Sequence, residues 1–70
     1  MTELLWFPIE STLEIWVAES DGHLATVSSD RLSSAWWAEL HEPSGRRTVV
    51  YQRSRTEAQA WCEHELARRR

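Results

Sequence analysis

Three histidines and one cysteine are the first candidates for a transition-metal site or for a nucleophile with its base: His23, His41, Cys62 and His64. A cysteine nucleophile needs a base beside it and an exposed, electropositive setting. Cys62 instead falls next to Trp61 on the apolar stripe of a predicted helix, where we expect a buried apolar side chain. Cys62 and His64 are two residues apart, about 200° around a helix, so they cannot share a metal ion. The pattern therefore predicts neither a cysteine nucleophile nor a metal site.

Other catalytic signatures are missing from the sequence. There is no glycine-rich phosphate loop, no GxSxG and no HExxH motif. The carboxylates fall mostly on positions predicted to be exposed, and no pair is placed in a pocket. A small-molecule pocket is also usually larger than so short a chain can enclose. We expect a protein that is not an enzyme and has neither a cofactor nor a small-molecule substrate.

Length and charge limit further which class of protein this can be. The chain has 70 residues, which allows one small domain, and a single cysteine excludes an internal disulfide. Self-association is then a natural source of additional buried surface. The net charge of −3 is not typical of a nucleic-acid-binding protein, and no signal peptide or membrane span is evident. We expect a cytoplasmic protein without a membrane partner.

The elements that must position any functional surface follow from periodicity and turn residues. Alternating apolar residues predict strands over 13–18, 23–28, 35–41 and 46–52, joined by turns at Asp21-Gly22 and Glu42–Gly45. Thr56 and Gln59 form a capping-box pattern that predicts a helix over 56–68. The fold class is therefore α+β, with a four-stranded antiparallel meander over 13–53. Residues 1–10 form an arm or a short edge strand, and the helix packs on one face of the sheet.

The register of the second hairpin divides its aromatic residues between two faces. Trp36 and Trp37 are neighbours on one strand, so they point to opposite sides of the sheet. A four-residue turn over 42–45 pairs Ala38 with Val49 and places Val49 and Tyr51 on the helix-covered face. The other face then carries Trp37 with Glu39 and His41.

The first hairpin leaves two registers open. A three-residue loop over 20–22 places Ala25 and Val27 on the face of the aliphatic residues Ile15 and Val17, and we favour it. A two-residue loop at 21–22 places them instead on the face of Trp16. In our interpretation Trp16 lies with the second hairpin's outer residues, away from the helix.

Tryptophan is unusually abundant, with five residues in a chain of 70 (Trp6, Trp16, Trp36, Trp37 and Trp61). Tryptophan is enriched at binding hot spots, and a large exposed apolar patch usually marks an interaction site. We therefore predict a protein-interaction module that forms a homodimer or acts as an adaptor or inhibitor of a larger protein. Its predicted contact residues are Trp16 and Trp37, with Glu39 and His41 at the rim. The alternative is that residues 4–9 fold over this face and bury it.

Nucleic-acid binding is a second hypothesis, based on the C-terminal arginines. Residues 1–45 hold one arginine and eight acids, whereas seven arginines follow. Candidate contact residues for this function are Arg46, Arg47, Arg53 and Arg55. Strands followed by the segment 53–61 and an alanine-rich helix resemble the C-terminal half of a double-stranded-RNA-binding domain. That family begins its final helix with a glycine and paired lysines, whereas this chain has Arg55, Thr56 and Glu57.

A second resemblance involves the first hairpin. Its Asp21-Gly22 turn, together with the Thr56-Glu57-Ala58 helix start, is similar to HicB-type antitoxin domains. The resemblance implies a sheet-and-helix partner of a small toxin, although the strand pair at 35–52 departs from that pattern. The chain also resembles small accessory proteins of bacteria and their phages. We assign no family on these motifs.

Overall fold

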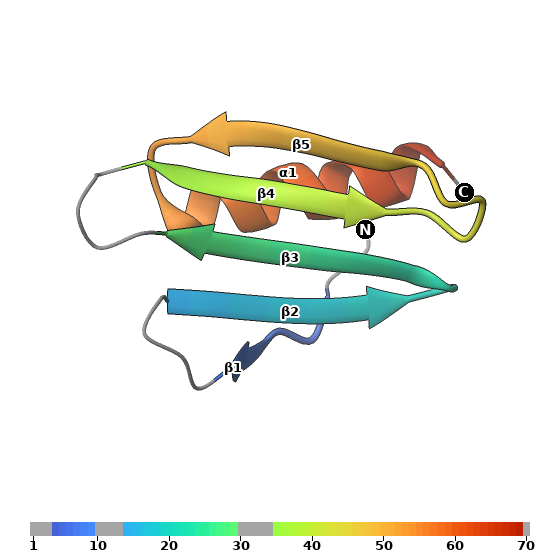
Figure 1. Ribbon diagram of the computed structural model, residues 1–70, viewed down its shortest axis with the longest axis horizontal. Helices are drawn as coiled ribbons and strands as arrows, with labels where there is room; N and C mark the ends of the chain where they lie inside the picture. Colours follow the sequence, from blue (N-terminus) through green and yellow to red (C-terminus); the bar gives the residue numbers. More distant parts are fainter. Residues whose placement is uncertain (1–3, 10–13, 30–34, 70) are drawn as a thin grey trace.

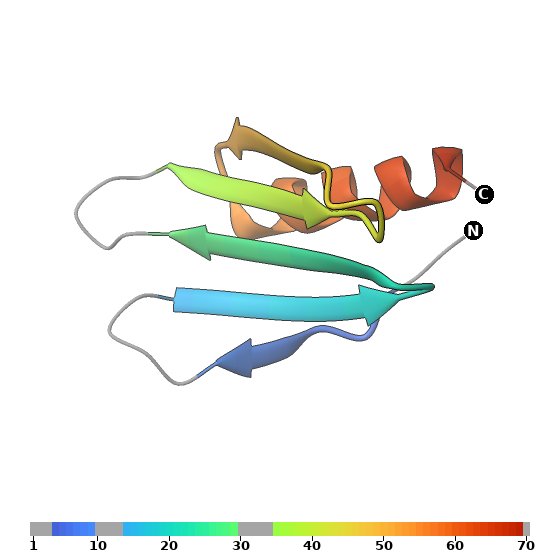
Figure 2. The same ribbon diagram turned by 45° about the vertical axis from the view of Figure 1, so that its right-hand side comes forward.

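A computed structural model of the chain describes residues 4–9, 14–29 and 35–69. Five strands form one antiparallel sheet in the order β1-β2-β3-β4-β5. They are β1 (Phe7–Ile9), β2 (Glu14–Ser20), β3 (His23–Ser29), β4 (Trp36–His41) and β5 (Arg47–Gln52). A C-terminal helix, α1 (Arg55–Arg68), packs against β3, β4 and β5 on one side of the sheet (Figures 1 and 2). The α+β class is confirmed, with one strand more than predicted.

The additional strand comes from the N-terminal segment. Phe7–Ile9 pair antiparallel with β2, so that Pro8 lies opposite Trp16 at the edge of the sheet. Proline is tolerated there because an edge strand need not donate every amide. Leu4 and Trp6 pack against the core on the helix side. The alternative that residues 4–9 bury the other face is therefore wrong: the segment extends the sheet.

The β2–β3 turn corrects the favoured register of the first hairpin. Ser20 pairs with His23, which leaves a two-residue loop of Asp21 and Gly22. Their φ angles are +52° and +78°, as a type I′ turn requires. The turn brings Ala18 opposite Ala25 and Trp16 opposite Val27. Trp16 therefore lies on the helix-covered face, and its predicted placement beside Trp37 is wrong.

The β4–β5 loop corrects the second register. Gly45 N donates to Glu42 O at 2.9 Å, as expected for the predicted turn, but Glu42 N then donates to Arg46 O at 2.8 Å. Gly45 and Arg46 both oppose Glu42, which is the arrangement of a G1 bulge with glycine at positive φ (+94°). One extra residue moves every β5 side chain to the other face. Ala38 pairs with Val50, and Val49 and Tyr51 leave the core.

The core lies between the sheet and one face of α1. Its fully buried side chains include Val27, Leu40, Cys62 and Leu66, with small alanines at Ala18, Ala25, Ala38 and Ala58. The alanines let the helix approach the sheet closely. Trp6, Trp16, Trp36 and Trp61 surround this core as partly buried side chains. Four of the five tryptophans thus belong to the helix side of the sheet.

The helix begins one residue before the predicted range. Ser54 caps it, because the Ser54 hydroxyl accepts from the Glu57 amide at 3.2 Å. The Glu57 carboxylate accepts in turn from the Arg53 amide at 3.2 Å. The arrangement is a variant of the capping box, displaced by two residues from the predicted Thr56 and Gln59 pair, in which Glu57 accepts from the amide that precedes the N-cap residue. Leu13 and the expected loop residues 30–34 lie outside the described part of the chain.

Candidate protein-docking face

No residue that the structure describes covers the sheet face opposite α1. We call it the open face, and the strand register defines it by three rows of side chains. The first row holds Ile9, Ile15, Ser28, Trp37 and Tyr51. The second holds Phe7, Val17, Thr26, Glu39 and Val49, and the third holds Glu19, Leu24, His41 and Arg47.

Large exposed apolar side chains concentrate on this face. Tyr51 is 73% exposed, Phe7 60% and Ile9 46%, and Leu24 and Val49 are also exposed. The one other large apolar residue that the described part of the chain exposes is Leu5, just before β1. Single exposed apolar residues are ordinary, but several on one sheet face are typical of an interaction surface. Here the most exposed side chains lie on the two edge strands, and the half-buried side chains of Ile15, Val17 and Trp37 lie between them.

Trp37 lies near the middle of the first row. Its cross-strand neighbours are Ser28 on β3 and Tyr51 on β5. These contacts leave the tryptophan only half-buried, whereas Ser28 between it and Ile15 is buried. A half-buried tryptophan on an uncovered sheet face is a residue type enriched at the energetic centres of interfaces.

An ion network occupies the polar end of the open face. The Glu39 carboxylate accepts from Arg47 Nη2 at 2.8 Å and lies 3.0 Å from His41 Nε2. The hydrogen bond from Arg47 lowers the pKa of Glu39 below its ordinary value, and His41 adds to this effect. Glu39 and His41 therefore lie on the predicted face, and Arg47 completes their network.

Trp16 has a different environment on the helix-covered side. The Arg55 guanidinium lies 4.6 Å from the centre of the Trp16 ring, a cation–π distance. Arg55 also pairs with Glu14 at 3.4 Å, and the Trp16 indole N–H points to the same carboxylate at 3.5 Å. Trp16 and Trp37 are therefore not brought together, and Trp16 does not contribute to the open face.

The four candidate nucleic-acid arginines are not gathered into one patch either. Arg47 lies on the open face and pairs with Glu39, whereas Arg55 starts the helix and covers Trp16. Arg46 lies 3.8 Å from Glu42 in the β4–β5 loop, and Arg53 is exposed before the helix. Their charges are thus divided between two sides of the sheet, and three of the four face a carboxylate.

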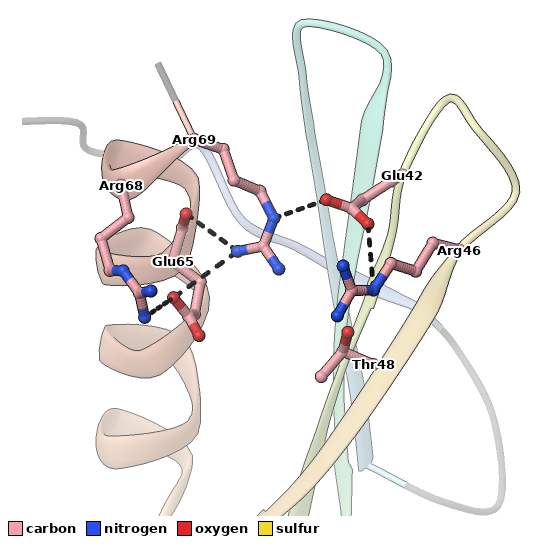
Figure 3. A pocket seen from close by; sticks show the side chains of 6 residues that line it. All are labelled: Glu42, Arg46, Thr48, Glu65, Arg68 and Arg69. Carbon is pink, nitrogen blue, oxygen red and sulfur yellow. Dashed lines mark hydrogen bonds and ion pairs between the residues drawn. The ribbon is translucent and has the colours of Figure 1, made fainter.

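A polar cavity of about 420 Å³ lies between the end of α1 and the β4–β5 loop (Figure 3). Arg69 Nε pairs with Glu42, and Arg69 Nη1 donates to the Glu65 carbonyl at 3.1 Å. Arg68 pairs with Glu65 at 2.9 Å. The bond from Arg69 lowers the pKa of Glu42. Because each of these charges is already matched, the cluster ties the helix end to the loop.

The other chemical candidates lie apart from one another. Cys62 is fully buried, and burial raises the pKa of its thiol to about 12. His23 lies at the first turn and His64 is exposed on α1. Across residues 4–9, 14–29 and 35–69 there is no group of three potential metal ligands, and no helix suited to crossing a membrane.

Comparison with protein-family models, with curated proteins and with solved structures found no match to this chain. The resemblances noted in the sequence therefore gain no support from it. The candidate site is therefore assigned from the arrangement of its residues. Sequence reasoning placed Trp37, Glu39 and His41 on the open face but missed Phe7, Ile9, Val49 and Tyr51. It also placed Ile15 and Val17 on the helix-covered side, and this prediction is wrong because both side chains lie in the rows of the open face. The turn at Pro43–Gly45 could have indicated the correct face of Val49 and Tyr51, because a glycine after a type I turn favours a bulge that shifts the following strand by one residue.

Proposed function

We propose that this protein is a non-enzymatic interaction module that docks on another protein through the open face. The observation that carries the proposal is the one-sided distribution of exposed apolar side chains. Phe7, Val49 and Tyr51 project from the sheet face that no described residue covers, while the opposite face is filled by α1. Covering such a surface would remove apolar area from water, which is the main driving force of protein association.

The composition of the face supports a specific contact. Trp37 and Tyr51 are adjacent across β4 and β5, and aromatic residues are enriched at the energetic centres of interfaces. Glu39, His41 and Arg47 at one end supply a polar rim. Charged groups at a rim contribute more to partner choice and association rate than to affinity.

Site-specific photo-crosslinking tests this proposal. The variant Tyr51→p-benzoylphenylalanine places a photoreactive ring at the most exposed aromatic position of the face. The matched control carries the same group at Ala60, which is exposed on α1. Irradiation in cells of the native host should give a discrete adduct at position 51 and none at position 60. Equal labelling at both positions, or no adduct at position 51, would overturn the proposal.

A further inference from the structure

We infer that the occupant of the open face is a second copy of this chain, stacked sheet on sheet about a twofold axis along β3. The inference rests on the proposed function and names its partner. Three properties of the face lead to it: its size, the arrangement of its rows, and the position of its charges.

Size favours a partner that covers the whole face. Five strands about 4.8 Å apart and up to seven residues long span roughly 20–25 Å in each direction. The projected area is then on the order of 500 Å², while a standard stable complex buries about 800 Å² of accessible surface on each partner. A twisted sheet is matched over its full width by another sheet of the same twist. A second copy provides that surface.

The rows select one twofold arrangement. Isologous stacking allows an axis along the strands or an axis across them. An axis across the strands would lay the third row on the first row, so that Glu19 of one copy covers Ile15 of the other. Glu19 has no ion pair among the described residues, and burying an unpaired charge is costly. An axis along β3 keeps each row on its own counterpart. β3 is the middle strand of five, so β2 then faces β4 of the other copy and β1 faces β5.

The charges agree with this arrangement. Glu19 on β2 is exposed and makes no ion pair with any residue the structure describes. It lies in the same row as His41 on β4, through Leu24. The twofold axis therefore brings Glu19 of each copy opposite His41 of the other, beside the Arg47 that pairs with Glu39. Two contacts between the Glu19 carboxylate of one copy and the His41 imidazole of the other close the polar end of the interface.

The centre of the face permits close approach. Thr26 and Ser28 on β3 are small, and each meets its own counterpart near the axis. In the outer strands, Phe7 on β1 lies over Val49 on β5 of the other copy. Facing positions in stacked sheets are about 10 Å apart, which a short bis-maleimide linker spans.

Pairwise cysteine crosslinking of the full chain tests the arrangement. A Thr26→Cys variant should crosslink to itself, and an equimolar mixture of Phe7→Cys and Val49→Cys should form a mixed dimer. Phe7→Cys alone and Val49→Cys alone should not crosslink, because β1 and β5 lie at opposite edges. Ala60→Cys is the control for an exposed helical thiol, and unsubstituted protein controls for the buried Cys62. Circular dichroism confirms that each variant folds.

Each other outcome has a defined meaning. Crosslinking of Phe7→Cys to itself would overturn the axis along β3. Failure of Thr26→Cys to exceed the Ala60→Cys control would overturn self-association. If the Tyr51 photo-adduct then contained a different protein, the proposed docking function would stand without this partner. The variant Glu19→Arg provides a further check. It should raise the dissociation constant of the dimer about tenfold relative to Ala60→Arg, because it places a positive charge near Arg47 of the other copy. An unchanged dissociation constant would contradict the contact between Glu19 and His41.

Discussion

Trp16 and Trp37 point to opposite faces of the same sheet. Trp16 lies opposite Val27, which itself lies opposite Ala38, so these three residues share the helix-covered face. Trp37 is the neighbour of Ala38 on β4 and therefore projects from the open face. The two tryptophans are both half-buried. Trp16 packs against the core with Arg55 over its ring, whereas Trp37 belongs to the proposed interface.

This relationship predicts opposite behaviour of two alanine variants. Trp16→Ala should lower the free energy of unfolding by about 2–3 kcal/mol, because it removes core contacts and the Arg55 cation–π contact. Trp37→Ala should cost the isolated chain only about 1 kcal/mol and mainly weaken association. Urea denaturation at low protein concentration separates the two effects. Equal destabilisation by both variants would contradict the assignment of faces.

Burial of Cys62 predicts a slow thiol. Because desolvation raises the thiol pKa to about 12, almost no thiolate exists at pH 8. Alkylation by iodoacetamide should therefore be slow in the folded protein and become rapid in denaturant. Mass spectrometry follows the modified fraction with time. Rapid modification of folded protein would argue against a structural role for this cysteine.

Two glycines at positive φ offer a matched pair of alanine variants. Gly45→Ala should cost about 1 kcal/mol for the left-handed conformation alone, because nothing lies within 4 Å of the added methyl group. At Gly22 the methyl would also lie 3.0 Å from Pro43 Cγ, where the two loops meet. Gly22→Ala should thus be the more destabilising in thermal unfolding. The opposite order would show that the loops do not pack as described.

The ion network on the open face predicts an acid-dependent contribution to stability. Because Arg47 lowers the folded-state pKa of Glu39, the carboxylate stabilises the fold above its unfolded pKa. This contribution disappears as pH falls through the folded-state pKa. Wild type should be more stable than Glu39→Gln at pH 6, and the difference should shrink towards pH 3. Denaturation curves at several pH values measure it, and a constant difference would mean that Glu39 acts through packing.

The sequence supported prediction of the element types and of the faces of α1 and β4, but not of the faces of β2 and β5. The alternation over 13–18 and 35–41 predicted the strands observed as β2 and β4. The apolar stripe of Ala58, Trp61, Cys62 and Leu66 predicted the buried face of the helix. These patterns repeat locally, so they can be recognised without knowledge of distant contacts. The candidate face was consequently predicted in part, with Trp37, Glu39 and His41 placed correctly.

The errors came from single loop residues. The predicted first loop included Ser20, which instead pairs with His23, so the predicted pairing of β2 with β3 was shifted by one residue. The prediction also lacked the bulge at Gly45, so the pairing of β4 with β5 was shifted by one residue. Such a shift exchanges the two faces of a strand while leaving its pattern unchanged. The sequence did not decide whether the N-terminal segment forms a strand or an arm, because three residues are too few to show an alternating pattern. Its pairing with β2 depends on contacts with residues distant in the sequence.

Molecular mass in solution tests the central claim most directly. Sedimentation equilibrium over a hundredfold dilution should show a mass falling from about twice the 8.2 kDa of one chain towards 8.2 kDa. Tyr51→Glu should shift this transition to at least about tenfold higher concentration, whereas Ala60→Glu should leave it unchanged. A mass of 8.2 kDa throughout the series, or a dimer that Tyr51→Glu does not weaken, would contradict self-association through the open face.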